Sequence, residues 1–520
     1  MTASLTYYDP TGTTLFAVGE DIPSIWNPFN VFDVRQFGAK PTNSGNTTQI
    51  QAALDAAEAN PSKPVYLPPG TFLTDALFMS GTGVTFFGPG TLKMKNNSTG
   101  AAVLILSSAD RCLVDGIRVD GSREYTHGGT AAGIQINGSS QRNRIRGTHV
   151  FNTLFDPNAT ADGEGYLIAG DHNILDNISS YDCDYAAVSC PGHYNTFVNP
   201  MILQTGLTLG ASNGVRSFTI DGDYNQILGG LVDQSLVNYA DSLNLGHACF
   251  LADPLPYTRE FIRIVGTVFK GGSNADNGGN VVKFARWNNI QIQGIKCLNF
   301  SSNHTLRFAE ACKWISIKDS EFDADVYKEN ALDPNTDCDY FYAENNKCGL
   351  NAAFRESAGF TNMRAKRMEF RRNVVYGNRF ATMDIADTAL EQCVFDDNHL
   401  YGQSDGVSPT SNIFVNTTDV NTMMIGSGKY VYLPNNRMTA QGAGANFTGG
   451  SAGKRELLTT IDRTGRNFEM AAAPVDASVS WRLRDRVYST ATPAAGQPDF
   501  WICKVAGVGG TSGQWQAHNL

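Results

Sequence analysis

From Val103 onward the chain repeats one short pattern of alternating apolar residues, a tight turn, a second apolar strand, and then Asn, Gly or Asp. The clearest copies are YLIAGDHNIL from Tyr166, AVSCPGHYNTF from Ala187 and FTIDGDYNQIL from Phe218. A unit this small cannot bury its own apolar side, so neighbouring units must stack to create a continuous core. Alternation with a period of two predicts strands, and stacking of successive units predicts that these strands run parallel.

Three of the turns share the sequence G-x-x-N, and their glycines are Gly170, Gly192 and Gly222, spaced 22 and 30 residues apart. These intervals suit one coil plus a loop of variable length. Asparagine at one turn position suits stacked side-chain amides and tolerates left-handed backbone. The sequence therefore predicts an all-β fold, a single-stranded right-handed parallel β-helix. An antiparallel sandwich or propeller is the alternative, but Asn-Gly hairpin turns do not recur from strand to strand.

One helical segment precedes the repeats. In TTQIQAALDAAEAN the apolar residues share a helical face, and Asn46 or Thr47 is available as the N-cap. We expect this helix to cover the open N-terminal end of the stacked coils. Together with the flanking FDVRQFGAK and VYLPPGTF, residues 31–72 resemble the opening motif of pectate-lyase-like β-helices, which include phage tailspike depolymerases and family 28 glycoside hydrolases. The resemblance implies the fold rather than a particular reaction.

The end of the chain has a different character. After Gly449 the repeats fade, and three of the six tryptophans (Trp481, Trp501 and Trp515) fall in the last 40 residues. We expect an N-terminal segment at 1–30, a polysaccharide-acting β-helix at 31–448 and a small β-rich module at 449–520. The last segment resembles C-terminal modules of phage and bacterial β-helix proteins, which implies trimerisation or sugar contact. A cap whose tryptophans are buried is the alternative.

Composition narrows the classes of partner. The formal net charge of −10 disfavours nucleic-acid binding, which needs a basic surface, and no apolar run is long enough to span a membrane. The ten cysteines lack C-x-x-C spacing, so we expect buried free thiols, no metal site and no cofactor. The N-terminus has neither a basic nor an apolar signal region, which predicts synthesis in a cytoplasm without export by the general signal route.

Hydrolysis of a glycosidic bond needs a proton donor and a second carboxylate. Asp162 and Asp184 each lie eight residues before the glycine of their own turn, so the repeat predicts that they stack about 4.8 Å apart. Glu164 and Asp182 lie two residues from these positions, which would bring four carboxylates together. One of the four should then stay protonated and act as the acid. Acids that merely decorate exposed turns are the alternative.

Other residues near this register complete the predicted site. Arg216 shares the register of Glu164 and is predicted to bind a carboxylate or an acidic sugar. Three tyrosines offer rings for stacking on sugars, and two histidines offer additional acid or base groups. They are Tyr166, Tyr181, Tyr185, His193 and His247.

The segments ADGEGYLIAG and YDCDYAAVSCPG resemble the two successive acidic segments of family 28 glycoside hydrolases. The resemblance implies that Asp162, Asp182 and Asp184 are the catalytic acids. Thr160 stands where the family has asparagine, Cys183 separates an Asp pair that is adjacent in the family, and no later basic signature follows. A strict polygalacturonase specificity is therefore not implied.

Two further charged segments stand out. In KDSEFDADV the acidic residues Asp319, Glu321, Asp323 and Asp325 occupy every second position, so in a strand they would share one face. The segment DPNTDCDYFYAE has acidic residues at the spacing of a calcium-binding loop, but Cys338 stands where that loop needs glycine. Between Arg355 and Arg379 basic residues alternate with apolar ones. This basic strip is predicted to bind an anionic polysaccharide, to pair with the acidic strand across a subunit interface, or to form a solvated face.

The leading hypothesis is a phage-type tailspike depolymerase that hydrolyses a bacterial capsule or O-antigen. The resemblance implies a homotrimer located in the virion tail, with other tail proteins as partners. A lyase acting on a uronic-acid polymer through the strip from Arg364 to Arg372 is an alternative within enzymes. A non-catalytic glycan-binding or adhesion protein is the alternative from another class.

Overall fold

The structure is a computed structural model, and it describes residues 30–401 with gaps, together with separate strands before and after that range. The gaps within 30–401 are 99, 125–131, 157–160, 185, 206–215, 236–258, 272–281, 299–303, 310–311, 329–337, 351–357, 364, 377–378 and 385–391. The chain divides into two compact units, residues 1–209 and 210–520, each of which we treat by itself. No helix among the described residues is long and apolar enough to cross a membrane.

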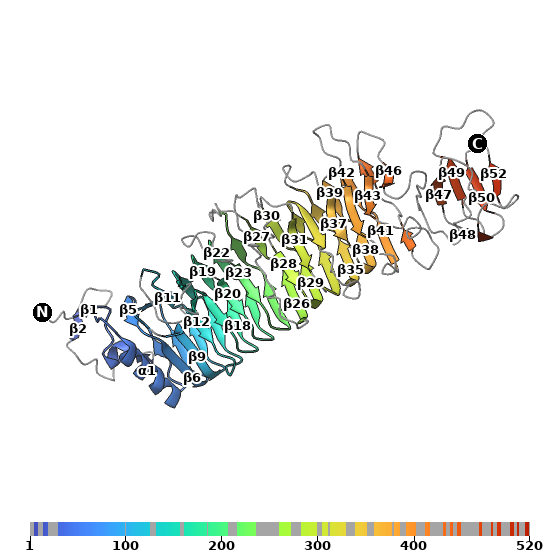
Figure 1. Ribbon diagram of the computed structural model, residues 1–520. Coiled ribbons are helices and arrows are strands. Elements are labelled where there is room, and N and C mark those ends of the chain that lie inside the picture. Colours follow the sequence, from blue (N-terminus) through green and yellow to red (C-terminus); the bar gives the residue numbers. More distant parts are fainter. Residues whose placement is uncertain are drawn as a thin grey trace. The chain divides into compact units, whose positions relative to one another are not determined.

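The first unit begins with the predicted helix, α1 (Thr47–Ala59), which packs against β6 (Leu77–Thr82) (Figure 1). Its apolar face is fully buried, as the spacing predicted, and consists of Ile50, Ala53, Leu54 and Ala57. Asn46 occupies the N-cap position, but its side chain does not cap the helix. Instead the Asn46 Oδ1 accepts a hydrogen bond of 2.8 Å from the Lys40 backbone N–H, so this amide ties the preceding loop to the start of the helix.

Three parallel sheets form most of this unit, and a complete coil contributes one strand to each sheet. Sheet 1 contains β3 (Phe32–Asp33), β4 (Val65–Tyr66), β7 (Thr85–Phe87), β10 (Leu113–Asp115), β13 (Arg144–Arg146), β18 (Ile174–Asp176) and β21 (Thr196–Val198). Sheet 2 contains β5 (Thr71–Thr74), β8 (Thr91–Met94), β11 (Arg118–Asp120), β14 (His149–Phe151), β19 (Ser179–Tyr181) and β22 (Met201–Leu203). Sheet 3 contains β6, β9 (Ala102–Asp110), β12 (Ala132–Ile136), β17 (Tyr166–Ile168) and β20 (Ala186–Cys190).

The second unit repeats this arrangement. Sheet 4 contains β24 (Asn225–Leu228), β26 (Arg259–Val265), β29 (Trp287–Gln293), β32 (Trp314–Lys318), β35 (Cys338–Glu344), β38 (Ala365–Arg371), β41 (Gln392–Asp396) and β44 (Tyr430–Tyr432). Sheet 5 contains β25 (Leu231–Asp233), β27 (Val268–Lys270), β30 (Lys296–Leu298), β33 (Glu321–Phe322), β36 (Lys347–Cys348), β39 (Val374–Tyr376), β42 (His399–Tyr401) and β45 (Arg437–Thr439). Sheet 6 contains β28 (Val282–Ala285), β31 (His304–Ala309), β34 (Asp325–Lys328), β37 (Ala358–Met363), β40 (Arg379–Asp384), β43 (Ser411–Asn416) and β46 (Ala445–Thr448).

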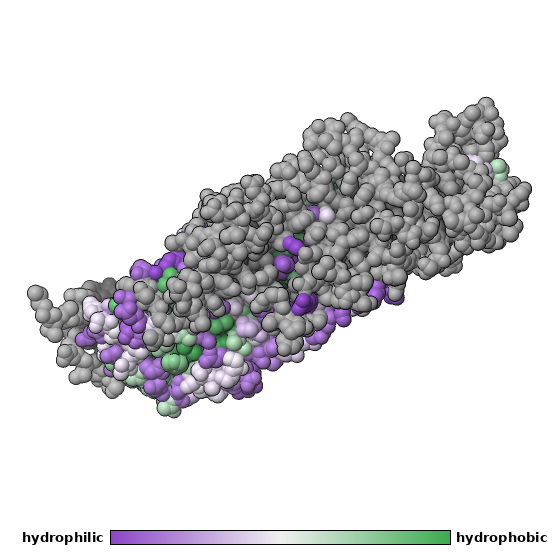
Figure 2. Space-filling model, in the orientation of Figure 1, coloured by the Kyte–Doolittle hydropathy of each residue, from purple (hydrophilic) through white to green (hydrophobic). Residues whose placement is uncertain are grey.

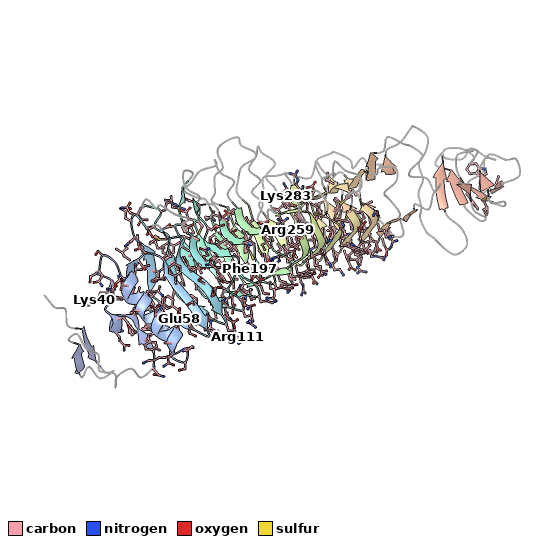
Figure 3. The ribbon with its side chains drawn as sticks, turned by 60° about the horizontal axis from the view of Figure 1, so that its bottom comes forward. Lys40, Glu58, Arg111, Phe197, Arg259 and Lys283 are labelled. Carbon is pink, nitrogen blue, oxygen red and sulfur yellow. The ribbon has the colours of Figure 1, made fainter. Side chains whose placement is uncertain are left out.

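Strands on successive coils pair in parallel register, so inward side chains stack in columns. In sheet 1 one column is Phe86, Val114, Ile145, Leu175 and Phe197, all fully buried. Figure 3 shows the labelled Phe197 within the coils, whereas Arg111 at a corner points outward. Each buried aliphatic or aromatic side chain of this kind stabilises the fold by about 1.5–3 kcal/mol. The predicted right-handed parallel β-helix is confirmed, and the antiparallel sandwich or propeller is wrong.

Asparagine ladders join the coils at two corners. In the first unit the Asn143 Nδ2 donates to the Asn173 Oδ1 at 3.1 Å, and the Asn173 Nδ2 donates to the Asn195 Oδ1 at 3.1 Å. The second unit has an equivalent ladder of Asn346, Asn373 and Asn398 at a different corner. The predicted stacking of amides is thus confirmed. The residue with positive φ, however, is the one before each asparagine, such as His172 at 58°.

The glycines of the G-x-x-N turns are required by close packing between coils. A Cβ atom at Gly170 would lie 2.0 Å from the Ser140 carbonyl oxygen, and one at Gly192 would lie 2.2 Å from the Gly170 carbonyl oxygen. Any larger residue would therefore push successive turns apart, which explains why these two repeats both keep glycine at this point.

Outward positions are mostly polar, but sheet 3 carries an apolar patch that Figure 2 shows in green over β9 and β12. In these strands Ala102, Ile105 and Ala132 form a buried apolar cluster, against which the partly buried Ala76, Ala101 and Leu167 pack. Eight cysteines are described, and all are free and buried, as expected for most of them.

Beyond residue 449 four strands pair in the order β47 (Asn467–Met470), β49 (Arg486–Ser489), β50 (Phe500–Cys503) and β52 (Trp515–His518). The β49–β50 and β50–β52 pairs are antiparallel, unlike the ladders of the coils. The expected boundaries at residues 31 and 449, and the role of the last segment, stay predictions.

Candidate functional site

An arginine and two aspartates meet where strands of sheet 2 end in the first unit. Arg123 follows β11, while Asp182 and Asp184 follow β19, which lies two strands along the same sheet. The Arg123 guanidinium forms ion pairs with both carboxylates, and its Nη2 lies 2.5 Å from the Asp184 Oδ1. It also donates to the backbone carbonyl oxygens of Asp182 and Thr153. One side chain thus ties three coils together.

This cluster is buried. The side chains of Arg123, Asp182 and Asp184 are 15%, 7% and 1% exposed. Burial alone lowers the pKa of Arg123, but the hydrogen bonds and charges of the two aspartates outweigh this effect and raise the pKa above its ordinary value. The guanidinium is therefore permanently charged. Arg123 thus supplies one positive charge that two aspartates share.

Cys183 lies between the two aspartates in the loop that follows β19. Burial raises the pKa of its thiol, so Cys183 is a neutral, inert group rather than a nucleophile. Cys183 separates Asp182 from Asp184 because its side chain is buried inside the coil, whereas the two carboxylates face Arg123.

The coil register holds only partly around this cluster. Tyr166 pairs with Val188, which keeps the predicted interval of 22 residues. The register does not reach Asp162, because β16 (Ala161–Asp162) pairs antiparallel with β15 (Phe155–Asp156). Asp162 is thus opposite Phe155 and not in the parallel ladder that was expected to stack it on Asp184. The side chain of Asp162 lies outside the described part of the chain.

Glu164 is joined to the cluster through the backbone. The Thr153 Oγ1 donates a hydrogen bond of 2.6 Å to the carbonyl oxygen of Gly163, and the Asp184 N–H donates one of 3.3 Å to the Thr153 carbonyl oxygen. Glu164 directly follows Gly163 and is 6% exposed. The segments that carry Glu164 and Asp184 therefore lie on either side of Thr153.

The other predicted residues differ in where the structure places them. Tyr166 is fully buried, and its hydroxyl donates to the carbonyl oxygens of Thr148 and Ser179, so the prediction that it stacks on sugars is wrong. Tyr181 is 38% exposed on sheet 2. His193 belongs to the Gly192 turn, at a different corner of the coil from Asp182. Tyr185, His247 and the Arg216 side chain lie outside the described residues.

A group of outward side chains on sheet 2, which we call the sheet 2 wall, was missed from the sequence. It consists of Arg118, His149, Phe151, Ser179 and Tyr181. The His149 ring stacks on Phe151 with centroids 5.1 Å apart, and the Arg118 guanidinium lies 5.4 Å from the Phe151 ring. Tyr181 is the parallel partner of Phe151 on the next coil. The alternation in HVF and SSY is the signal that identifies these residues as outward.

Within this wall the His149 Nδ1 lies 2.8 Å from the Ser179 Oγ. Burial and then the charge of Arg118 lower the pKa of His149, so the ring is neutral at neutral pH. The wall is therefore an aromatic and hydrogen-bonding surface rather than a strongly charged one, and it runs directly into Asp182 after Tyr181.

The acidic segment near Asp319 does not form one strand face, so that expectation is wrong. Asp319 occupies a corner with φ of 52°, and Glu321 on β33 pairs with Lys296 and Lys347 at 2.9 and 3.1 Å. Asp325 is fully buried. Two corners interrupt the alternation, because a coil turns from one sheet to the next within these few residues.

The basic strip has the predicted alternation, with Met368 and Phe370 buried in β38. Its charges pair within the chain: Lys366 with Asp339 at 2.6 Å, Arg371 with Glu369 at 2.8 Å, and Arg372 with Glu344. Much of the calcium-loop segment, 333–337, lies outside the described residues. Where side chains are described, no group of three or more His, Cys, Asp or Glu residues is arranged to hold a metal ion.

The fold is that of a pectate-lyase-like parallel β-helix, in line with the resemblance of residues 31–72. Residues 31–116 match the family model described as rhamnogalacturonase A/epimerase, pectate lyase-like. No curated protein sequence matches the chain.

Solved structures that are similar to this chain include the following three. A tailspike protein of Escherichia coli bacteriophage HK620 is 10% identical, with 83% of this chain and 84% of that one covered and a TM-score of 0.48. An exopolygalacturonase from Thermotoga maritima is 9% identical, with 81% and 94% covered and a TM-score of 0.39. PfbA, a surface adhesin of Streptococcus pneumoniae, is 13% identical, with 77% and 93% covered and a TM-score of 0.44.

Proposed function

We propose that this protein is a polysaccharide depolymerase of the phage-tailspike type, which hydrolyses glycosidic bonds in a bacterial capsule or O-antigen. One observation carries the proposal: Asp182 and Asp184 are gathered around Arg123 directly beside the sheet 2 wall. A row of outward side chains along stacked strands suits an extended polymer better than a small molecule. The match of residues 31–116 to a family described as rhamnogalacturonase A/epimerase supports a glycan as the ligand.

We assign the catalytic chemistry to Asp162, Glu164, Asp182 and Asp184. A neighbouring guanidinium favours the ionised form of a carboxylate, and an ionised carboxylate can act as a base or nucleophile. Asp182 and Asp184 are both paired with Arg123 in this way. The proton donor then falls to Glu164 or Asp162 on the segment across Thr153. The exposed Tyr181 ring stacks on the sugar next to the cleaved bond, and Tyr185, which directly follows Asp184 in the chain, contributes to substrate binding.

The decisive experiment follows two products at once when the protein is incubated with capsular and lipopolysaccharide glycans. Hydrolysis releases new reducing ends without ultraviolet absorbance, whereas a lyase produces reducing ends together with the absorbance of unsaturated uronates. We expect the first result. Glu164→Gln and Asp184→Asn should each abolish release while the protein stays folded, and Asp176→Asn on sheet 1 is the matched control. Full activity in both site variants would place the chemistry elsewhere in the chain.

A non-catalytic glycan-binding or adhesion protein is the second candidate. The burial of Asp184, 1% exposed and paired with Arg123, favours it, because such an ion pair also serves as a purely structural link between coils. Binding of glycans without any release of reducing ends would establish this candidate in place of the depolymerase.

We also propose that the protein assembles as a homotrimer at a virion tail with other tail proteins. The resemblance of residues 31–72 to tailspike depolymerases supports this proposal. Light scattering coupled to size-exclusion chromatography tests the assembly directly, since a trimer has three times the 56.3 kDa mass of the chain and a monomer refutes it.

A further inference from the structure

Three aromatic rings lie together on the outer face of sheet 4, in the second unit. Trp314 on β32 is 54% exposed, the largest exposed fraction among the large hydrophobic side chains described. Its parallel partner on β35 is Tyr340, and the two ring centroids are 5.5 Å apart. Tyr342, two residues further along β35, stacks on Tyr340 at 6.2 Å with an interplanar angle of 15°. We call these three residues the aromatic platform.

The tyrosines of the platform are held in fixed orientations. The Tyr340 hydroxyl donates to the Glu369 Oε1 at 3.1 Å, and the Tyr342 hydroxyl donates to the Glu344 Oε2 at 2.7 Å. Partial burial and the nearby glutamates raise the pKa of each tyrosine to about 12, so both hydroxyls stay protonated. The Lys318 ammonium lies 5.0 Å from the centre of the Tyr342 ring. A preformed surface of this kind loses little conformational entropy on binding.

Charged side chains around the rings form ion pairs with one another. Lys318 and Arg372 pair with Glu344, while Arg371 pairs with Glu369 and with Asp396. Three cations therefore face three carboxylates. Two members of the basic strip that border these rings, Arg371 and Arg372, are thus paired with carboxylates of the same chain, which weakens their attraction for an anionic ligand.

We propose that the aromatic platform of Trp314, Tyr340 and Tyr342 is a separate glycan-binding site, which takes neutral sugar rings of a polysaccharide. The apolar C–H face of a sugar ring packs against the exposed Trp314 indole, and the hydroxyl groups at its rim bond to the carboxylates and guanidinium groups around the rings. The site rests on the proposed function only in that its ligand is a polysaccharide. No residue of the hydrolytic set takes part, and the platform lies on another sheet in the other unit.

The test is affinity electrophoresis of the full chain in gels containing neutral dextran, galactomannan or xyloglucan, or anionic alginate. At least one neutral polymer should retard the wild-type protein, and Trp314→Ala should weaken that binding about tenfold. Trp314→Phe, which keeps a ring, should bind with intermediate affinity. Phe78→Ala is the matched control, because Phe78 is 49% exposed on sheet 3 of the first unit. The thermal midpoint of each variant verifies folding.

Three results would overturn the proposal: no retardation by any neutral polymer, equal binding by wild type and Trp314→Ala, or a change in oligomeric state of Trp314→Ala that marks the rings as a subunit contact. The outcome is independent of hydrolysis. If the wild type releases no reducing ends but its retardation depends on Trp314, the glycan-binding role of the aromatic platform is supported and the depolymerase proposal is refuted. If Glu164→Gln loses hydrolysis while Trp314→Ala binds normally, the depolymerase proposal is supported and the glycan-binding role of the aromatic platform is refuted.

Discussion

The Arg123 Nη2 lies 2.5 Å from the Asp184 Oδ1, so a guanidinium that follows β11 neutralises a carboxylate that follows β19, two coils further on. The same guanidinium binds Asp182. Because both carboxylates are buried, removing the guanidinium takes away a positive charge that both of them face in a place of low polarity. The cluster is therefore both a candidate site and a link between coils, and its variants separate these roles.

Arg123→Met should lower the free energy of unfolding of the first unit by about 3–5 kcal/mol, the usual cost of breaking a buried ion pair from one side. Denaturant unfolding followed by far-ultraviolet circular dichroism measures the change. Arg144→Met is the control, because Arg144 is 48% exposed in its pair with Asp176 and should cost less than about 1 kcal/mol. Equal losses in the two variants would mean that burial of the Arg123 cluster has no energetic consequence.

Asn173→Ala should destabilise the first unit by about 2–4 kcal/mol. The substitution removes the Oδ1 that accepts from the Asn143 N–H and the Asn143 amide, and the Asn195 Oδ1 keeps only its bond from the backbone N–H of residue 173. Asn177→Gly is the comparison, since Asn177 is exposed and has a φ of 51° that glycine adopts without strain. A loss below about 0.5 kcal/mol for Asn173→Ala would show that the amide ladder is dispensable.

His149 should make stability depend on pH in a defined direction. Burial, followed by Arg118, lowers the pKa of the folded-state imidazole below 6.5, so the unfolded chain takes up the proton first. Wild-type stability should therefore fall relative to His149→Gln as the pH drops below about 6.5, and the difference should be constant above that pH. Urea midpoints of both proteins between pH 5 and pH 8 measure it. A difference that is flat throughout, or that grows in the opposite direction, contradicts the assigned shift.

If the proposed depolymerase is correct, Tyr181→Ala should raise KM about five- to tenfold with little change in kcat. Loss of a stacking ring removes binding that is equal in the ground state and the transition state. Met201→Ala provides the control, because Met201 is an exposed side chain of the same sheet, 48% accessible and without a ring. The initial rate of reducing-end release, measured against substrate concentration, reports both constants. A fall in kcat at constant KM would instead place Tyr181 in the chemistry.

The sequence by itself determined the architecture. Alternating apolar residues, turns that return at coil-length intervals, and one amphipathic segment at 47–59 are local patterns, and each local pattern dictates the same fold. Glycine at 170 and 192 and asparagine at 173 and 195 follow from contacts that every coil repeats. Because such contacts recur from coil to coil, the residues that make them can be recognised in the sequence alone.

The site depended on contacts that do not repeat. Arg123 reaches Asp182 across 59 residues, and no spacing rule connects them. Asp162 leaves the register because its segment folds into an antiparallel hairpin, and Tyr166 turns inward while Tyr181 turns outward. At each coil corner the alternation of inward and outward side chains is interrupted, and the sequence does not show how many residues the interruption takes. Only the tertiary structure decided which charges meet and which rings are exposed, because these outcomes depend on where each strand ends relative to its neighbour.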